Sequence, residues 1–500
     1  MFQKVLFPET ITFGENVLLL SKYAIIYSVL FICLLILVLL LAIKLNISKT
    51  NHLQVFNLLK NVVAFSLLLL FFLNFFKFLI SVVRIRVYNQ FLVDLIYSFE
   101  FKLGYTLSSY NTALCDSIVL LAIITGMVCI FLLGDKHLYG NLINIIYFLF
   151  FILVTIAMVY TVNLLVLFIS FEMIFIPTIY FVYKLGYIKK TDKTIKYLLH
   201  WTLGGAFLIF VVICYLFSVY KTLNIYTLSS YTFSSTEQAV IYISLFIGFG
   251  IKIPVYPFHF WLTKVHVEAP AGFSIFLSGF LVKTAVYCFF FFINIFFNVY
   301  VSKFVLVIAL LGIFDSSIKM WSQLDFKKLI AFATIQEMNI ILLFLVLTNN
   351  INDYIFVVFI FIHGLLSTLM FYVVDLIQKR TSTRNLIELS GFGISNPKMR
   401  QILWGILIFF MGFPLTVKFL VEWKVLFLLY TQSLFLTLAI FIVLNVVAVI
   451  GFTKQLLILI YGNIGLTFLE TSDISKKDFS LIFFLAYILF LLNFFAIYIL

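Results

Sequence analysis

The chain has 500 residues, of which 64% are hydrophobic and only 11% are charged. Soluble domains are about half apolar and about a quarter charged, so this composition excludes a soluble globular protein and indicates an integral membrane protein. The net charge of +13 does not indicate nucleic-acid binding, because the basic residues lie in short segments between apolar runs. The five cysteines lack CxxC spacing, which argues against a disulfide framework, a zinc site or an iron–sulfur cluster.

Continuous apolar runs of about 20 residues recur along the chain, each long enough to cross a membrane as a helix. They predict an all-α integral membrane fold with about 14 transmembrane helices, because the strands of a membrane barrel would alternate polar and apolar residues instead. The predicted spans are 17–44, 57–83, 113–134, 140–159, 162–184, 195–219, 237–259, 272–298, 301–321, 327–348, 352–377, 399–428, 432–452 and 479–500.

Basic residues are concentrated after the odd-numbered spans, as between Lys184 and Lys196 or between Lys379 and Arg400. Such loops mark one side of the membrane under the positive-inside rule. Both termini are therefore predicted to lie on the opposite side. An even number of spans also requires the two termini to share a side.

The stretch from Gly248 to Cys288 contains two apolar spans, and each carries a lysine in its interior, Lys252 and Lys283. Pro254 lies two residues after the first lysine and removes a backbone donor, which breaks the helix there. A helix broken at membrane depth is tolerated only against protein or a water-filled cavity, and a charge beside the break marks a functional site. The alternative, a lysine that reaches the headgroups from a helix end, fits Lys283 poorly because mostly apolar residues flank it on both sides. The pattern favours an ion-conducting role for both lysines.

A second break is predicted at Gly412-Phe413-Pro414. Paired interrupted helices in corresponding positions are typical of transporters built from inverted repeats, although either break alone would fit an ordinary proline kink. We therefore predict four regions. Residues 1–139 form helices 1–3, 140–298 a first five-helix repeat (helices 4–8), 299–452 a second (helices 9–13), and 453–500 a loop and the last helix.

Further ionisable residues lie within or beside the apolar spans. Glu172 has apolar neighbours on both sides, and a carboxylate in a membrane needs a lysine partner, whose affinity for a proton it then influences. His363 suits a proton relay, because histidine titrates near neutral pH, but a hydrogen-bonded structural role is nearly as well supported. Glu422 follows the second break as Lys252 adjoins the first, and Lys418, one turn earlier, is its expected i,i+4 ion partner.

For the remaining ionisable residues, the sequence distinguishes less clearly between a structural and a functional role. His259 and His266 flank the short loop predicted after the first broken helix, where a loop-capping role is favoured over a relay role. Glu337 and Asp375 fit either a structural or a functional role. No phosphate-binding loop, nucleophile elbow or metal-ligand cluster occurs in the sequence. Lysines, glutamates and a histidine at membrane depth favour the movement of protons.

The sequence resembles the antiporter-like membrane subunits of respiratory complex I. The residues that carry the resemblance occur in the same order as in that family and cover roughly residues 100–455. They are SFEMIFIPT (170–178), WTLGGA (201–206), KIPVYPFHFWLTKVHVEAPAGFSIFLSGFLVKTAVY (252–287), QLDFKKLIAFATI (323–335), HGLLSTLMF (363–371) with RTSTR (380–384), and FPLTVKFLVEW (413–423).

The resemblance implies a fourteen-helix fold with two inverted five-helix repeats, and it implies roles for individual residues. Lys252 would bind the proton on the first broken helix, with Glu172 as the charge partner that tunes it. Lys283 and His363 would form the central relay, and Glu422 the terminal proton site. Beside these five, Glu337, His259 and Lys418 are weaker relay candidates.

Two residues depart from the family pattern. Glu337 stands where the family usually has a histidine, so either it relays protons itself or that relay position is not needed. Lys379 replaces the acidic residue that usually precedes the motif beginning at Arg380.

The resemblance also implies a setting. The chain would be a subunit of the proton-translocating NADH:ubiquinone reductase, with no cofactor, metal or redox centre of its own. NADH, FMN, iron–sulfur clusters and ubiquinone would be bound by partner subunits. Its partners would be the other membrane-arm subunits, including two related antiporter-like chains, and membrane lipids, but not nucleic acid. The bias towards Phe, with 64 residues against 21 Gly and 7 Pro, suggests an AT-rich organelle genome. We therefore expect a multi-pass protein of the mitochondrial inner membrane, with both termini on the intermembrane-space side.

Three alternatives remain open at the level of sequence. A cation/proton antiporter would use the same helices and residues, and sodium-dependent exchange without a link to NADH would indicate it. A plastid counterpart that uses plastoquinone is the second. A purely structural membrane scaffold is the third, and it predicts that Glu172, Lys252 and Glu422 tolerate neutral replacement together.

Overall fold

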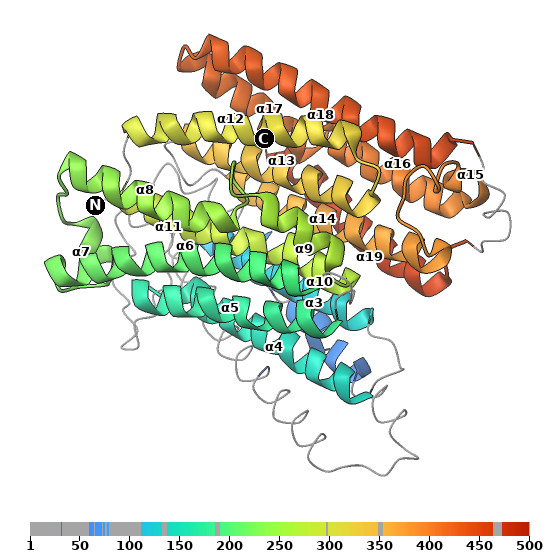
Figure 1. Cartoon of the computed structure of the whole chain (residues 1–500), viewed down its shortest axis with the longest axis horizontal. Helices are drawn as coiled ribbons and strands as arrows, with labels where there is room; N and C mark the ends of the chain where they lie inside the picture. Colours follow the sequence, from blue (N-terminus) through green and yellow to red (C-terminus); the bar gives the residue numbers. More distant parts are fainter. Residues whose placement is uncertain are drawn as a thin grey trace, which may run out of the picture.

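The computed structural model of the chain describes residues 112–132, 138–185, 191–296, 299–348, 354–463 and 473–499, together with Ile32 and most of residues 60–79. Within these ranges the chain is helical and has no β-strand, and pairing outside the helices is limited to isolated bridges such as Asn163–Asn224. The helices lie side by side and roughly parallel (Figure 1). The predicted all-α membrane fold is thus confirmed. The predicted span 17–44, Ile32 apart, lies outside the described residues, and 57–83 is described only in part.

The unbroken helices follow the predicted spans closely. One differs at its end, since the thirteenth span was predicted to stop at residue 452 and its helix continues to Tyr461. Their bounds are α3 (Thr112–Phe131), α4 (Leu138–Tyr160), α5 (Leu164–Leu185), α6 (Thr191–Tyr220), α12 (Val299–Ser322), α13 (Phe326–Leu347), α14 (Tyr354–Thr381), α18 (Phe435–Tyr461) and α19 (Lys476–Ile499). Two short helices, α7 (Ile225–Ser229) and α15 (Phe392–Ser395), lie in connections. In the described part of the chain, seven helical segments are long and apolar enough to cross a membrane, and shorter apolar helices accompany them.

The first predicted break is present. Helix α8 (Ser235–Lys252) begins at a capping box formed by Ser234 and Glu237 and ends at Lys252. Residues 253–259 are not helical, and α9 (Phe260–Glu268) follows. Pro254 and Pro257 cannot donate backbone hydrogen bonds, so the helix cannot continue through them. The indole Nε1 of Trp261 donates to the carbonyl oxygen of Ile251 at 2.7 Å, which satisfies an acceptor that the break exposes.

The next predicted span, 272–298, is a helix with an irregular turn inside it. It consists of α10 (Ala271–Phe276), a π-helical turn η1 (Leu277–Leu281) and α11 (Val282–Phe296). A π-turn widens the helix, frees backbone groups from the regular ladder and occurs frequently at functional sites. Lys283 lies in the first turn after η1, and its Nζ donates to the carbonyl oxygen of Ser278. The sequence analysis did not anticipate this turn.

The second predicted break separates α16 (Pro397–Met411) from α17 (Val417–Thr431). Gly412 ends α16 with φ of 68°, a left-handed conformation that glycine adopts without steric cost. A Cβ at this position would also lie 3.1 Å from Oε2 of Glu422. The backbone N–H of Val417 donates to Oδ1 of Asn493 on α19 at 2.7 Å, so a neighbouring helix supports the start of α17.

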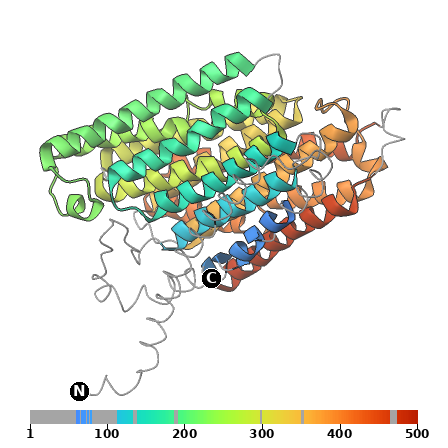
Figure 2. The same ribbon diagram turned by 90° about the horizontal axis from the view of Figure 1, so that it is seen from below.

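Helix α14 contacts helices from widely separated parts of the chain. It packs against α3, α10 and η1, which precede it, and against α13, α17 and α19. The approach is closest where Gly364 of α14 crosses Gly279 of η1, since a Cβ on Gly364 would lie 2.8 Å from the carbonyl oxygen of Gly279. Small residues allow such contact between membrane helices. At the edge of the bundle, the described part of residues 60–79 lies beside α19 (Figure 2), with 5.8 Å between the ring centroids of Phe71 and Phe484.

Candidate functional site

Lys252 and Glu172 form an ion pair at the first broken helix. Lys252 is the last residue of α8 and is fully buried, and its Nζ lies 2.6 Å from Oε1 of Glu172 on α5. The ammonium group also lies 3.9 Å and 3.8 Å from the ring centroids of Phe171 and Phe175, which is a favourable cation–π geometry. The structure thus brings together the two residues that the sequence analysis expected to pair. An isolated charge at this depth would be strongly unfavourable.

Lys283 is the second buried lysine of the first half. It is fully buried, and its Nζ donates to the carbonyl oxygen of Ser278, which the π-turn makes available. The lysine also interacts electrostatically with Glu337 of α13. Among the described residues, no hydrogen bond or ion pair joins Lys283 directly to Lys252. Lys283 therefore lies within electrostatic range of Glu337 on α13.

His363 lies on α14, which packs against α10 and η1 and against α13 and α17. Its side chain is buried, and neither ring nitrogen has a hydrogen-bond partner within the described part of the chain. It interacts electrostatically with both Lys283 and Lys418. His363 therefore lies within electrostatic range of one lysine on α11 and one on α17.

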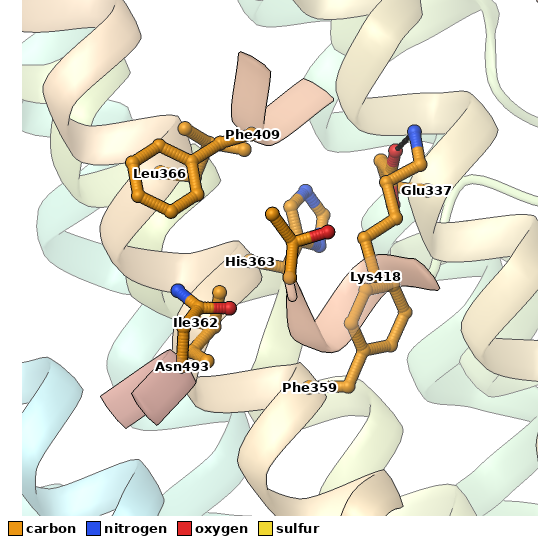
Figure 3. Close-up of a pocket in the computed structure, with 9 residues that line it drawn as sticks. Glu337, Phe359, Ile362, His363, Leu366, Phe409, Lys418 and Asn493 are labelled. Carbon is orange, nitrogen blue, oxygen red and sulfur yellow. Dashed lines mark hydrogen bonds and ion pairs between the residues drawn. The ribbon is translucent and has the colours of Figure 1, made fainter. Parts of the chain in front are cut away.

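Three charged residues, Glu337, Lys418 and Glu422, meet at the second break, and Figure 3 draws the first two of them. The Nζ of Lys418 on α17 contacts Oε1 of Glu337 on α13 and donates to the carbonyl oxygen of Phe410 at 2.6 Å. Glu422, one turn along the same helix, lies farther away, with 3.7 Å between Nζ of Lys418 and its Oε1. The predicted i,i+4 pair is present, but Glu337 is the nearer partner. These three residues are called the second-half triad below.

A small cavity adjoins the second-half triad and has room for about one water molecule. Figure 3 shows His363 between Lys418 and the residues that line the opposite wall. The lining residues are Glu337, Phe359, Ile362, His363, Leu366, Phe409, Thr416, Lys418 and Asn493. The cavity is lined mostly by apolar atoms, but the polar groups of Glu337, His363 and Lys418 also border it. A water molecule there can connect the unpartnered histidine with the ion pair.

The prediction that His259 and His266 cap a loop is wrong. His259 precedes α9, but its side chain makes no capping hydrogen bond. Its Nε2 lies 2.8 Å from Oδ2 of Asp315 on α12, close but not aligned as a hydrogen bond, and Asp315 pairs with Lys319 at 2.6 Å. His266 lies inside α9, and its ring stacks on Phe371 with 4.5 Å between centroids. Within the described ranges, no hydrogen bond or ion pair joins either histidine side chain to Glu172 or Lys252.

Sequence reasoning underestimated Glu337 and did not pair it with Lys418. A signal for this pairing was present in the sequence. A carboxylate inside an apolar helix, such as Glu337, requires a cation, and Lys418 had been assigned only Glu422 as a partner. Asp375, which was also ambiguous, pairs with Lys379 at 2.6 Å. In the described ranges, no group of three or more His, Cys, Asp or Glu side chains is placed to hold a metal ion.

Comparison with known proteins identifies a family that the chain matches. Residues 161–448 match the family described as NADH:quinone oxidoreductase/Mrp antiporter, TM. A relative from Paramecium tetraurelia, NADH-ubiquinone oxidoreductase chain 4, is 32% identical over 402 residues, which are 79% of this chain and 83% of the relative.

Two solved structures share the fold. One is a chain of respiratory complex I from Thermus thermophilus, with a TM-score of 0.74, 17% identity and coverage of 95% of both chains. The other belongs to an archaeal membrane-bound sulfane sulfur reductase, with a TM-score of 0.76, 15% identity and coverage of 96% of this chain and 94% of that one. The family match spans more than half of the chain, and it includes both broken helices and the charged residues beside them. The chain belongs to the NADH:quinone oxidoreductase/Mrp antiporter transmembrane family.

Proposed function

We propose that the chain conducts protons in the membrane arm of an NADH:ubiquinone oxidoreductase, in the position of chain 4. The observation that carries the proposal is the ion pair between Glu172 and the fully buried Lys252, at 2.6 Å, at the end of the broken helix α8. Charged residues within membrane helices are rare, and those that persist mark ion and proton pathways. The 32% identity to a chain 4 relative over 79% of this chain supports the choice of complex.

We propose that the ion pair couples a charge change elsewhere in the complex to the release of a proton from Lys252. In our proposal, a charge change that arrives along the membrane arm alters the distance between Glu172 and Lys252. An opposite charge favours the ionised form of its partner, so the pair controls whether Lys252 keeps its proton. A proton released there moves towards Lys283, which the π-turn holds in the interior, and then to His363. Glu422 is the proposed terminal site.

The arrangement of the helices supports two inverted repeats in this mechanism. We propose that α4 to α11 form the first and α12 to α18 the second, each with a broken helix as its fourth membrane element. Helix α14 packs against both. A movement of one repeat can then change the surroundings of Lys283 and His363, where the two repeats meet.

We propose that the redox chemistry belongs to partner subunits. NADH, FMN, iron–sulfur clusters and ubiquinone would be bound elsewhere in the complex, and two related antiporter-like chains would be neighbours in the membrane arm. The complex would lie in the mitochondrial inner membrane, with both termini of this chain on the intermembrane-space side. Apolar side chains exposed on α6 and α18, such as Phe207 and Val443, would face lipid or these neighbours.

The assignment is tested by a native gel of gently solubilised membranes, stained for NADH oxidation, with the peptides in each band identified. The chain is expected in the large NADH-oxidising band. The family also includes Mrp antiporters, so a cation/proton antiporter is the second candidate. Migration apart from the NADH-oxidising activity, together with sodium-dependent proton exchange, would favour that candidate.

The role of Lys252 is tested by replacing it with alanine and measuring protons pumped per NADH in sealed vesicles. We expect the ratio to fall. Lys303→Ala is the matched control, because Lys303 is an exposed lysine near the start of α12 and its replacement should leave the ratio unchanged. An unchanged ratio in Lys252→Ala would show that Lys252 has no role in pumping.

A further inference from the structure

The two halves of the chain contain the same arrangement of a carboxylate and a lysine. In the first half, Glu172 lies on the second helix, α5, and pairs with Lys252 at the broken fourth helix. In the second half, Glu337 lies on the second helix, α13, and pairs with Lys418 at the broken fourth helix. The partners are 80 residues apart in the first pair and 81 in the second. Both pairs thus join a carboxylate of the second helix to a lysine beside the break, although Lys252 ends the helix before its break and Lys418 lies at the start of the helix after the second break.

The second pair also differs from the first because its lysine has a second carboxylate nearby. Lys418 contacts Glu337 and lies 3.7 Å from Glu422. The side chains of all three are largely buried, at 5%, 3% and 12% exposure respectively. Two carboxylates and one ammonium group would leave an unbalanced negative charge in a membrane interior, which is unfavourable. The second-half triad is therefore well suited to accept one further proton.

The cavity offers a route by which that proton can arrive. His363 is buried, has no hydrogen-bond partner for either ring nitrogen within the described residues, and lines the same cavity as Glu337 and Lys418. The cavity has room for about one water molecule. A water molecule there would link an imidazole nitrogen to the Glu337 carboxylate.

We propose that Glu337 and Lys418 form a second switch, which transfers protons from His363 to Glu422. Protonated His363 gives a proton to the Glu337 carboxylate through the cavity water, and the ion pair with Lys418 opens. The Lys418 ammonium group then turns to Glu422 and gives it a proton, which leaves an amine and a carboxylic acid. Neutral Glu337 returns its proton to the Lys418 amine, the ion pair forms again, and Glu422 carries the transferred proton onward.

This inference rests on the proposed proton-conducting function, so the experiment must separate the two. The variants are Lys418→Arg and the double variant Glu337→Gln with Lys418→Gln, both in the intact complex in sealed vesicles, beside Lys252→Ala. Arginine keeps the charge of the pair but does not release its proton in proteins. The double variant removes both charges of the pair together, a change that is often neutral for stability. Glu422 loses its ammonium neighbour in this variant, and as a largely buried group it can remain uncharged as the carboxylic acid.

Two readouts are needed: the amount of assembled complex on a native gel, and proton translocation driven by NADH. For both variants we expect assembly close to that of the wild type, with translocation reduced to the same fraction as in Lys252→Ala. A purely structural ion pair predicts normal translocation in the assembled double variant, and that result would overturn the switch. Normal translocation in Lys418→Arg would overturn the switch as well. Because this variant keeps the ion pair, it still provides the test if the double variant fails to assemble. If Lys252→Ala pumps normally while the two Lys418 variants do not, the result contradicts the proposed function and leaves the switch in place.

Discussion

Replacing Glu172 with glutamine is the most direct test of the first ion pair. The change keeps the shape of the side chain but removes the negative charge that lies 2.6 Å from Nζ of Lys252. At this distance, and with an effective dielectric constant of about 20, the attraction between unit charges is about 6 kcal/mol. Part of it offsets the desolvation of both groups, and removal of one partner from a buried pair costs about 3–5 kcal/mol.

The cost should lie near the lower end of that range. The Glu172 side chain is 25% exposed, so solvent or a neighbouring subunit screens part of the attraction. The rings of Phe171 and Phe175 also remain next to the ammonium group and stabilise it by about 1–2 kcal/mol. We therefore expect Glu172→Gln to lower the stability of the folded chain by about 3 kcal/mol. The complex should still assemble in reduced amount.

The assay compares assembled complex on a native gel with proton translocation driven by NADH, normalised to the assembled amount. Normalised translocation should fall, because the charge that controls the proton on Lys252 is gone. Glu388→Gln is the matched control, since Glu388 is an exposed carboxylate that accepts a hydrogen bond only from nearby Asn385 among the interactions described. Wild-type assembly together with wild-type translocation in Glu172→Gln would refute the reasoning about this pair.

Three further predictions follow from the helix contacts. Lys283→Met keeps an unbranched apolar stem in place of the buried lysine, so the complex should assemble while NADH-driven translocation is lost; retained translocation would remove Lys283 from the pathway. Gly364→Ala places a Cβ 2.8 Å from the carbonyl oxygen of Gly279, and such overpacking costs about 1–3 kcal/mol; a lower thermal stability of the solubilised complex is expected, and an unchanged one would show that α14 can shift. Trp261→Phe leaves the Ile251 carbonyl oxygen without its indole donor, at a cost of about 1–3 kcal/mol; hydrogen exchange in residues 253–259 should become faster, and no change would mean that the indole does not support the break.

Much of the fold could be predicted from local sequence. The apolar runs set the positions of the helices, because the length and hydropathy of a segment are properties of that segment alone. Pro254 and the Gly412–Pro414 segment predicted both breaks for the same reason, since each acts on the backbone where it occurs. The need of Glu172 for a lysine partner also followed from its apolar surroundings. The length of α18 did not, because the polar residues 453–455 interrupt the apolar run while the helix continues through them. The π-turn before Lys283 did not either, because hydropathy barely changes across it.

Which charged groups meet was decided only by the tertiary structure. Sequence spacing offered Lys418 the partner one helical turn away, Glu422, yet its Nζ contacts Glu337, which is 81 residues distant. His259 likewise meets Asp315 of α12 instead of its own loop. Spacing along one helix determines only which residues share a face of that helix. The packing of α13 against α17 brings Glu337 to the lysine, and a buried charge is stabilised by the nearest opposite charge in space. The sequence alone therefore determined that this protein crosses a membrane with charged, broken helices, and the packing of those helices decided how the charges are paired.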